Sequence, residues 1–160
     1  MKVLVAFQGD SGSNTKVAEQ LKKSFEAKGW IVELQPVLPK EKKKWFHHIK
    51  DFRKNKKVEL KKAVTDVKKF DLIVVGTPVW TYKPTPVITT YLRSLENTKG
   101  KKFVLFVTCV GIPGTTIKRM SSILSTKAAK VQGSFVIRSI FTLDEKKLVQ
   151  VKEFAEKFEF

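Results

Sequence analysis

Cysteine, histidine and long apolar runs are all scarce in this sequence. Its one cysteine, Cys109, excludes an internal disulfide, which favours a reducing, cytoplasmic setting. No apolar run approaches the roughly 20 residues that a membrane-spanning helix requires, so we expect no membrane span. The only histidines, His47 and His48, are adjacent. Their side chains would diverge by about 100° on a helix, so we expect no metal site.

Acidic residues are scarce as well, because 15 Asp and Glu stand against 32 Lys and Arg, for a formal net charge of +17. Such a charge attracts acidic proteins, nucleic acid or anionic cofactors, and it does not determine the fold. A solvated, lysine-rich surface is the simpler alternative. The basic residues are densest in residues 40–62, where Trp45, Phe46, Ile49 and Phe52 have the spacing of a short amphipathic helix.

Short apolar segments alternate with segments of helical periodicity. The former predict strands over residues 2–7, 30–36, 69–76, 103–110 and 135–140; the latter predict helices over 14–28, from about 85, over 115–124 and from 144 onward. Continuous apolar strands that alternate with helices predict a parallel sheet covered on both faces. We therefore predict a three-layer α/β sandwich with a five-stranded parallel sheet of order 2-1-3-4-5. One domain would span residues 1–160, with a basic, partly helical insert at about 37–62 after the second strand.

Three loops should meet at the carboxyl edge of this sheet, where such folds bind ligands. The first, 9–15, opens a helix whose N–H groups suit a phosphate, although helix capping alone also explains it. The second, 76–84, carries Trp80 and Tyr82, whose rings suit stacking on a flat ligand or packing at the rim. The third, 108–115, has two glycines, which allow close backbone approach but also suit a plain turn.

Two segments resemble the signatures of the flavodoxin family. Residues 9–19 (GDSGSNTKVAE) are similar, without a gap, to Ser-x-Thr-Gly-Asn-Thr-x-x-Val-Ala-Glu, and residues 71–80 (DLIVVGTPVW) resemble the family's second signature. The order of predicted elements extends the resemblance over essentially the whole chain. The resemblance implies a flavodoxin-like fold and FMN as cofactor.

The resemblance also implies which residues contact FMN. The first loop would hold the phosphate, the second would lie along the isoalloxazine with Trp80 near the ring, and the third would contact the other edge. The implied cofactor-binding residues are Ser11, Gly12, Ser13, Asn14, Thr15, Thr77, Pro78, Val79, Trp80, Thr81, Tyr82, Thr108, Cys109, Val110 and Gly111. The sequence departs from the family at Gly9 (usually Ser), Ser13 (Asn) and Thr81 (Gly in many members). No catalytic residue is expected.

Electron transfer is the function that the resemblance implies. The positive charge would steer an acidic redox partner, such as a ferredoxin-like protein or a reductase. An FMN-dependent NAD(P)H oxidoreductase of the quinone-reductase kind is one alternative, since Trp45 and Phe46 are available to roof a substrate site. A flavin-free binding module that uses the basic insert is the other. We do not expect nucleic-acid binding, because the aromatic residues of the insert share one helical face, and the sequence leaves a homodimer open.

The charge predicts the redox potential of the bound flavin. Acidic flavodoxins surround the flavin with negative charge, which disfavours its anionic reduced form. A lysine about 10 Å from the ring would contribute roughly 1–2 kcal/mol in the opposite direction at an effective dielectric near 20, before salt screens it. With the insert near the ring, FMN should therefore be reduced at a higher potential than in an acidic flavodoxin. A spectroelectrochemical titration that gives an equally low potential would refute this.

Overall fold

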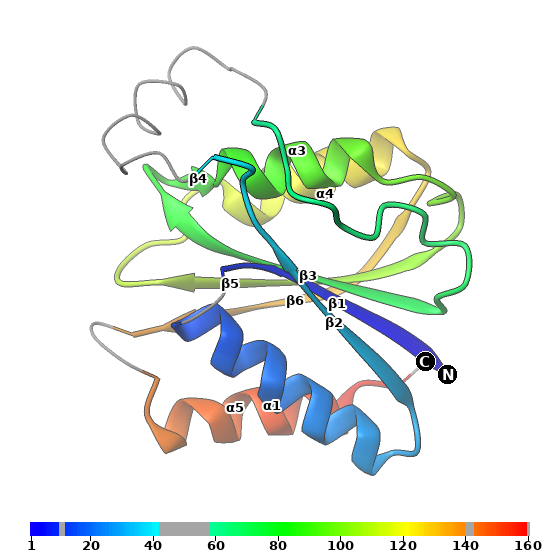
Figure 1. The fold of residues 1–160 in the computed structure, drawn as a ribbon. Helices are drawn as coiled ribbons and strands as arrows, with labels where there is room; N and C mark the ends of the chain where they lie inside the picture. The colour runs from blue at the N-terminus through cyan, green and yellow to red at the C-terminus, as the bar shows by residue number, and fades with distance from the viewer. Residues whose placement is uncertain (10–11, 42–57, 140–142, 160) are drawn as a thin grey trace.

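The structure, a computed structural model, describes residues 1–9, 12–41, 58–139 and 143–159 (Figure 1). Its elements are β1 (Lys2–Gln8), α1 (Ser13–Ala27), β2 (Ile31–Val37), β3 (Leu72–Trp80), β4 (Lys83–Pro84), α3 (Pro86–Ser94), β5 (Lys102–Cys109), α4 (Thr116–Thr126), β6 (Lys130–Arg138) and α5 (Glu145–Lys157). None of the helices in this part of the chain is long and apolar enough to cross a membrane. The amphipathic helix expected around Trp45 and Phe46 falls outside the described residues.

The sheet has the topology that the sequence predicts. Its parallel strands follow the order β2-β1-β3-β5-β6, and the two-residue strand β4 adds an antiparallel pairing to β3. Without β4, this is the predicted order 2-1-3-4-5. Helices α1 and α5 cover one face of the sheet and α3 and α4 cover the other, which gives the three predicted layers (Figure 1).

Burial explains which strands were easy to recognise. The central strands β1, β3 and β5 are buried along most of their length, and each reads as a continuous apolar run. The edge strand β6 begins at Lys130, earlier than the expected 135. Its first residues are exposed and mostly polar, so they resemble a loop in sequence. It pairs with β5 from Lys102↔Lys130 onward.

The predicted second loop, 76–84, is largely strand, which corrects the sequence interpretation. Strand β3 continues through Trp80, since its pairing with β5 extends to Pro78↔Thr108 and its last residues pair with β4. Thr81 and Tyr82 form the intervening two-residue turn, with positive φ of 46° and 63°. A hairpin of this kind favours Asn or Gly at both positions, so nothing in the local sequence signalled it.

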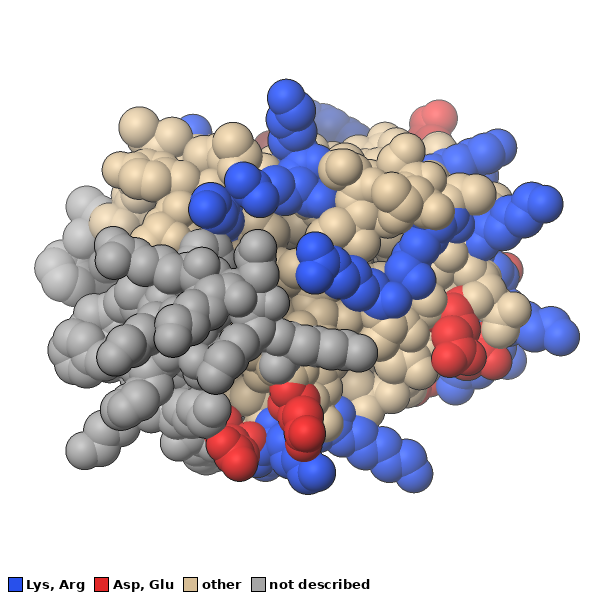
Figure 2. Space-filling model, turned by 90° about the horizontal axis from the view of Figure 1, so that it is seen from above, with Lys and Arg blue, Asp and Glu red and all other residues tan. Residues whose placement is uncertain are grey.

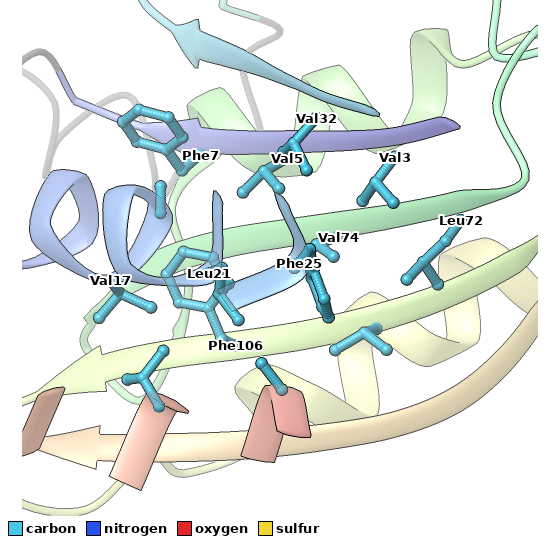
Figure 3. Close-up of a cluster of buried hydrophobic side chains, with 14 of the residues drawn as sticks. Val3, Val5, Phe7, Val17, Leu21, Phe25, Val32, Leu72, Val74 and Phe106 are labelled. Atoms are coloured by element: carbon cyan, nitrogen blue, oxygen red, sulfur yellow. The ribbon is translucent and has the colours of Figure 1, made fainter. Parts of the chain in front are cut away.

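Two apolar clusters fill the space between the sheet and its helix layers. On the α1–α5 side, Leu21 and Phe25 of α1 pack with Val5 of β1 and Val74 of β3 (Figure 3). On the other side, the cluster includes Ile73, Ile88, Tyr91, Leu92, Leu105 and Met120. These clusters hold the carboxyl ends of the strands, and with them the loops, in fixed relative positions.

Gly76 offers a direct test of this packing. A Cβ atom built on it would come within 1.9 Å of the Phe106 ring. We predict that Gly76→Ala lowers the free energy of unfolding by about 1–3 kcal/mol, because a core this dense resists an added methyl. Gly111→Ala is the matched control: its added Cβ meets no atom within 4 Å, so its effect should stay within about 0.5 kcal/mol. Urea denaturation of both variants measures the difference, and equal effects would contradict the packing.

Candidate cofactor site at the carboxyl edge of the sheet

A cleft of about 390 Å³ lies where the carboxyl ends of the central strands meet the start of α1. Its lining residues are Gln8, Gly9, Ser13, Asn14, Pro78, Val79, Thr108, Cys109, Val110 and Ser139. Strand β1 has β2 on one side and β3 on the other, so the chain crosses from one side of β1 to the other between these two strands. The cleft therefore occupies the point where strand order reverses, the usual ligand position in open α/β sheets.

Most of the residues expected at this site lie at or beside the cleft. Seven of them line it: Ser13, Asn14, Pro78, Val79, Thr108, Cys109 and Val110. Gly12 and Thr15 belong to the first turn of α1, Trp80 ends β3, Thr81 and Tyr82 form the turn, and Gly111 follows β5. Thr77 is fully buried. Ser11 falls outside the described residues.

The side chain of Asn14 is committed to bonds within the protein. Its amide nitrogen donates to the backbone oxygen of Gln8 (3.2 Å), and its amide oxygen accepts from the Thr108 hydroxyl (2.9 Å). Both Asn14 and Thr108 are buried. Asn14 therefore fixes the start of α1 against the ends of β1 and β5, and its side chain positions the site.

Buried threonines hold the end of β3 in a similar way. Thr85 caps α3 by accepting from the backbone N–H of Ile88, and its hydroxyl donates to the side-chain oxygen of Gln8. The backbone N–H of Thr85 donates to the Thr77 hydroxyl (3.3 Å). Strand β3, the start of α3 and the end of β1 are thus joined by polar contacts below the cleft.

The first turn of α1 has unsatisfied hydrogen-bonding capacity. Gly12 is the N-cap, with φ 87° and no side-chain cap within the described residues. The first backbone bond of the helix runs from the N–H of Lys16 to the oxygen of Gly12. The N–H groups that precede it have no intrahelical acceptor. Within the same residues, the Thr15 hydroxyl is the buried side-chain polar atom that has no hydrogen-bond partner. This turn offers donors to an anion.

Backbone contacts bring the second and third loops together. The backbone oxygen of Tyr82 accepts from the N–H (2.9 Å) and the hydroxyl (3.2 Å) of Thr115. A Cβ added to Gly114, whose φ is 57°, would lie 2.4 Å from the Cβ of Tyr82, so this close approach requires glycine. The turn after β3 and the loop after β5 therefore form one wall beside the cleft.

Three lining residues were not among the predicted contacts: Gly9, which belongs to the first predicted loop, and Gln8 and Ser139, which lie outside the three loops. Gln8 ends β1, and the N–H of Ser139 donates to the oxygen of Cys109 (2.9 Å) at the end of β6. Both residues occupy the carboxyl edge of a strand, and that position was the signal that could have identified them.

The comparisons with known proteins agree with this geometry. The family model described as flavodoxin matches residues 2–139. The chain therefore belongs to the flavodoxin family, as its motifs imply. No curated protein sequence matches it significantly.

Solved structures show the same fold at low sequence identity. A Lactobacillus acidophilus flavoprotein in complex with FMN is 21% identical, with a TM-score of 0.66 over 84% of this chain and 92% of that one. An archaeal flavodoxin is 18% identical, with a TM-score of 0.63 over 97% and 94%. Oxidised flavodoxin 1 from Bacillus cereus is 15% identical, with a TM-score of 0.68 over 98% and 95%. At these identities the structures establish the fold.

The Cys109 thiol provides a chemical probe of the cleft. Burial raises its pKa above the ordinary value, against a weaker opposite effect of Arg138. A raised pKa means less thiolate at a given pH, and the thiolate is the reactive form. We predict that Cys109 reacts with a disulfide reagent more slowly at pH 8 than a free thiol does, and that the rate continues to rise above the usual thiol pKa. A rate that reaches its plateau below pH 8 would contradict the raised pKa of this partly buried thiol.

Proposed function

We propose that this protein is an electron carrier that binds FMN in the cleft at the carboxyl edge of its sheet. The observation that carries the proposal is the Thr15 hydroxyl, which is buried without a partner at a helix N-terminus that lacks a side-chain cap in the described residues. An unpaired buried hydroxyl is costly, and a phosphate oxygen would satisfy it. The family to which the chain belongs supports FMN as the source of that phosphate.

The residues present fit the two ends of FMN. Ser11, Gly12, Ser13, Asn14 and Thr15 would surround the phosphate, with Asn14 acting through position rather than through its committed side chain. The proposed flavin contacts are Thr77, Pro78, Val79, Trp80, Thr81 and Tyr82 on one side and Thr108, Cys109, Val110 and Gly111 on the other. When bound, FMN supplies the electron-transfer chemistry, while the protein supplies orientation and electrostatics. We propose that residues 1–160 act as one unit.

The lining of the cleft favours electron transfer over substrate chemistry. Among the described lining residues, Cys109 is the one with an ionisable side chain, and the others are neutral or apolar. A general acid or base needs a carboxylate, imidazole or amine within reach of the reacting atoms. The lining residues would therefore surround a bound flavin and tune its redox potential, but they provide no group that transfers protons to a substrate. Direct steady-state oxidation of NAD(P)H by the purified protein would instead favour the oxidoreductase alternative.

Thr15→Val tests the phosphate assignment because it should change two properties in opposite directions. The hydrogen bond to a charged phosphate is lost, so FMN should bind about tenfold or more weakly. The FMN-free protein should keep its stability or gain about 1 kcal/mol, because a buried hydroxyl without a partner is removed. Quenching of FMN fluorescence measures the affinity, and urea denaturation measures the stability.

Ser125→Ala, on the exposed end of α4, is the control and should leave both properties unchanged. If the Thr15→Val variant binds FMN as tightly as the parent, the assignment of the phosphate to this turn is wrong. A parent protein that fails to retain FMN would remove the electron-carrier function altogether.

A further inference from the structure

Charge is unevenly distributed along the chain and over its surface. Between Asp71 and Asp144 the sequence has ten Lys and Arg residues, and Glu96 is the only acidic one. This part of the chain forms β3 to β6 and therefore both helices of one layer, α3 and α4. Positive charge in the part of the chain that includes this helix layer is thus almost unopposed by acidic residues.

The two helix layers differ in sign as well as in position. Helices α3 and α4 carry Arg93, Lys118 and Arg119, all exposed, and no acidic residue. Helices α1 and α5 carry glutamates among their lysines, with ion pairs such as Lys22–Glu26 (3.6 Å). In the view onto the α3–α4 side, Lys and Arg side chains spread across the surface and the Asp and Glu side chains lie toward its margins (Figure 2).

The basic surface adjoins the cleft. The guanidinium Nε of Arg119 donates to the Thr115 hydroxyl (3.0 Å), which in turn donates to the backbone oxygen of Tyr82 (3.2 Å). Lys83 follows Tyr82 directly and begins β4, which packs against α4. We call Lys83, Arg93, Lys118 and Arg119 the basic face.

The exposed apolar side chains beside the cleft indicate what kind of partner the basic face would meet. Tyr82, Val110 and Ile112 are 63%, 67% and 70% exposed, and they belong to the two loops that Thr115 joins. An apolar centre with charges around it is the usual composition of a protein–protein interface. Within the described residues, Tyr82 is the one exposed aromatic ring of this surface and α3 and α4 add none, whereas single-stranded nucleic acid is usually bound by several stacking rings.

We propose that the basic face, together with Tyr82, Val110 and Ile112, is the docking surface for an acidic redox protein. The proposal rests on the proposed function, because a partner on this surface would approach the cofactor at the loops that hold it. The lysines and arginines would attract the partner from a distance and orient it. The apolar side chains would then exclude water at the centre of the contact.

Two charge-reversal variants of equal net charge test the proposal. Arg93→Glu/Lys118→Glu changes the basic face, and Lys23→Glu/Lys157→Glu changes exposed positions on α1 and α5. Each pair includes one basic residue in the last turn of its helix, Arg93 or Lys157, so the helix-dipole interaction lost at that position is matched between the two variants. An acidic [2Fe–2S] ferredoxin is the probe, and its dissociation constant is measured by calorimetry with and without added FMN.

The basic-face variant should bind ferredoxin about tenfold more weakly at low salt while the control stays within about twofold, and the difference should disappear near 0.5 M salt, where charges are screened within about 4 Å. Equal weakening of both variants would overturn the proposal, because only net charge would then matter. Selective weakening of binding to a single-stranded oligonucleotide, without ferredoxin binding, would overturn it in favour of nucleic acid.

Two further measurements separate the possible failures. If the glutamate variant unfolds at lower urea than the control, Arg93→Gln/Lys118→Gln replaces it, and the neutral variant must still weaken ferredoxin binding. Selective ferredoxin binding by a protein that does not retain FMN would support the docking surface and refute the electron carrier. FMN retention without selective ferredoxin binding would support the electron carrier and refute the docking surface.

Discussion

The buried Asn14 side chain joins the consecutive elements β1 and α1 to Thr108 of β5, which lies 94 residues further along the chain. By bonding to Gln8 and Thr108, it holds the first turn of α1 over the ends of β1 and β5. The cleft, the free N–H groups of the turn and the unpaired Thr15 hydroxyl all lie where they do because of this link. Buried amide bonds of this kind are strongly directional and costly to break, so the site is built into the fold before any ligand arrives.

The two helix layers also differ in charge, since α3 and α4 carry basic residues and no acidic ones, whereas α1 and α5 carry both. Each side of the sheet has its own cluster of buried apolar residues, and the exposed Arg93, Lys118 and Arg119 of α3 and α4 belong to neither. Mutual repulsion among these cations opposes the folded state, although solvent and salt reduce it. The proposed docking of an acidic redox protein would give this charged surface a function.

Much of the fold could be predicted from the sequence because the relevant signals are local. Apolar runs located the central strands and helical periodicity located the helices. Thr85 and Asp144 cap two of these helices, each accepting a bond from the third residue after it. The hairpin at Thr81 and Tyr82 and the early start of β6 could not be predicted. Both depend on pairing with a neighbouring strand. Thr81 and Tyr82 have no preference for a turn, and the start of β6 includes a lysine and a glycine, which are depleted in strands.

The site shows the same division between local and tertiary information. The resemblance to flavodoxins indicated the three loops, and the structure brings the described parts of them to one edge. The resemblance could not indicate that the Asn14 side chain is bonded within the protein or that the Thr15 hydroxyl lacks a partner. Those properties depend on what Gln8 and Thr108 place beside the turn. Gln8 and Ser139 escaped notice because their role follows from position at a strand end and not from residue type.

The most direct test of the account is a titration of the ¹⁵N-labelled protein with FMN, followed through its amide resonances. We expect the largest shifts at residues 12–15, 77–82 and 108–111, with the Thr15 amide among the first to move and α5 unaffected. Shifts that are absent, or that centre on the α1–α5 face, would contradict a cofactor site at the carboxyl edge of the sheet.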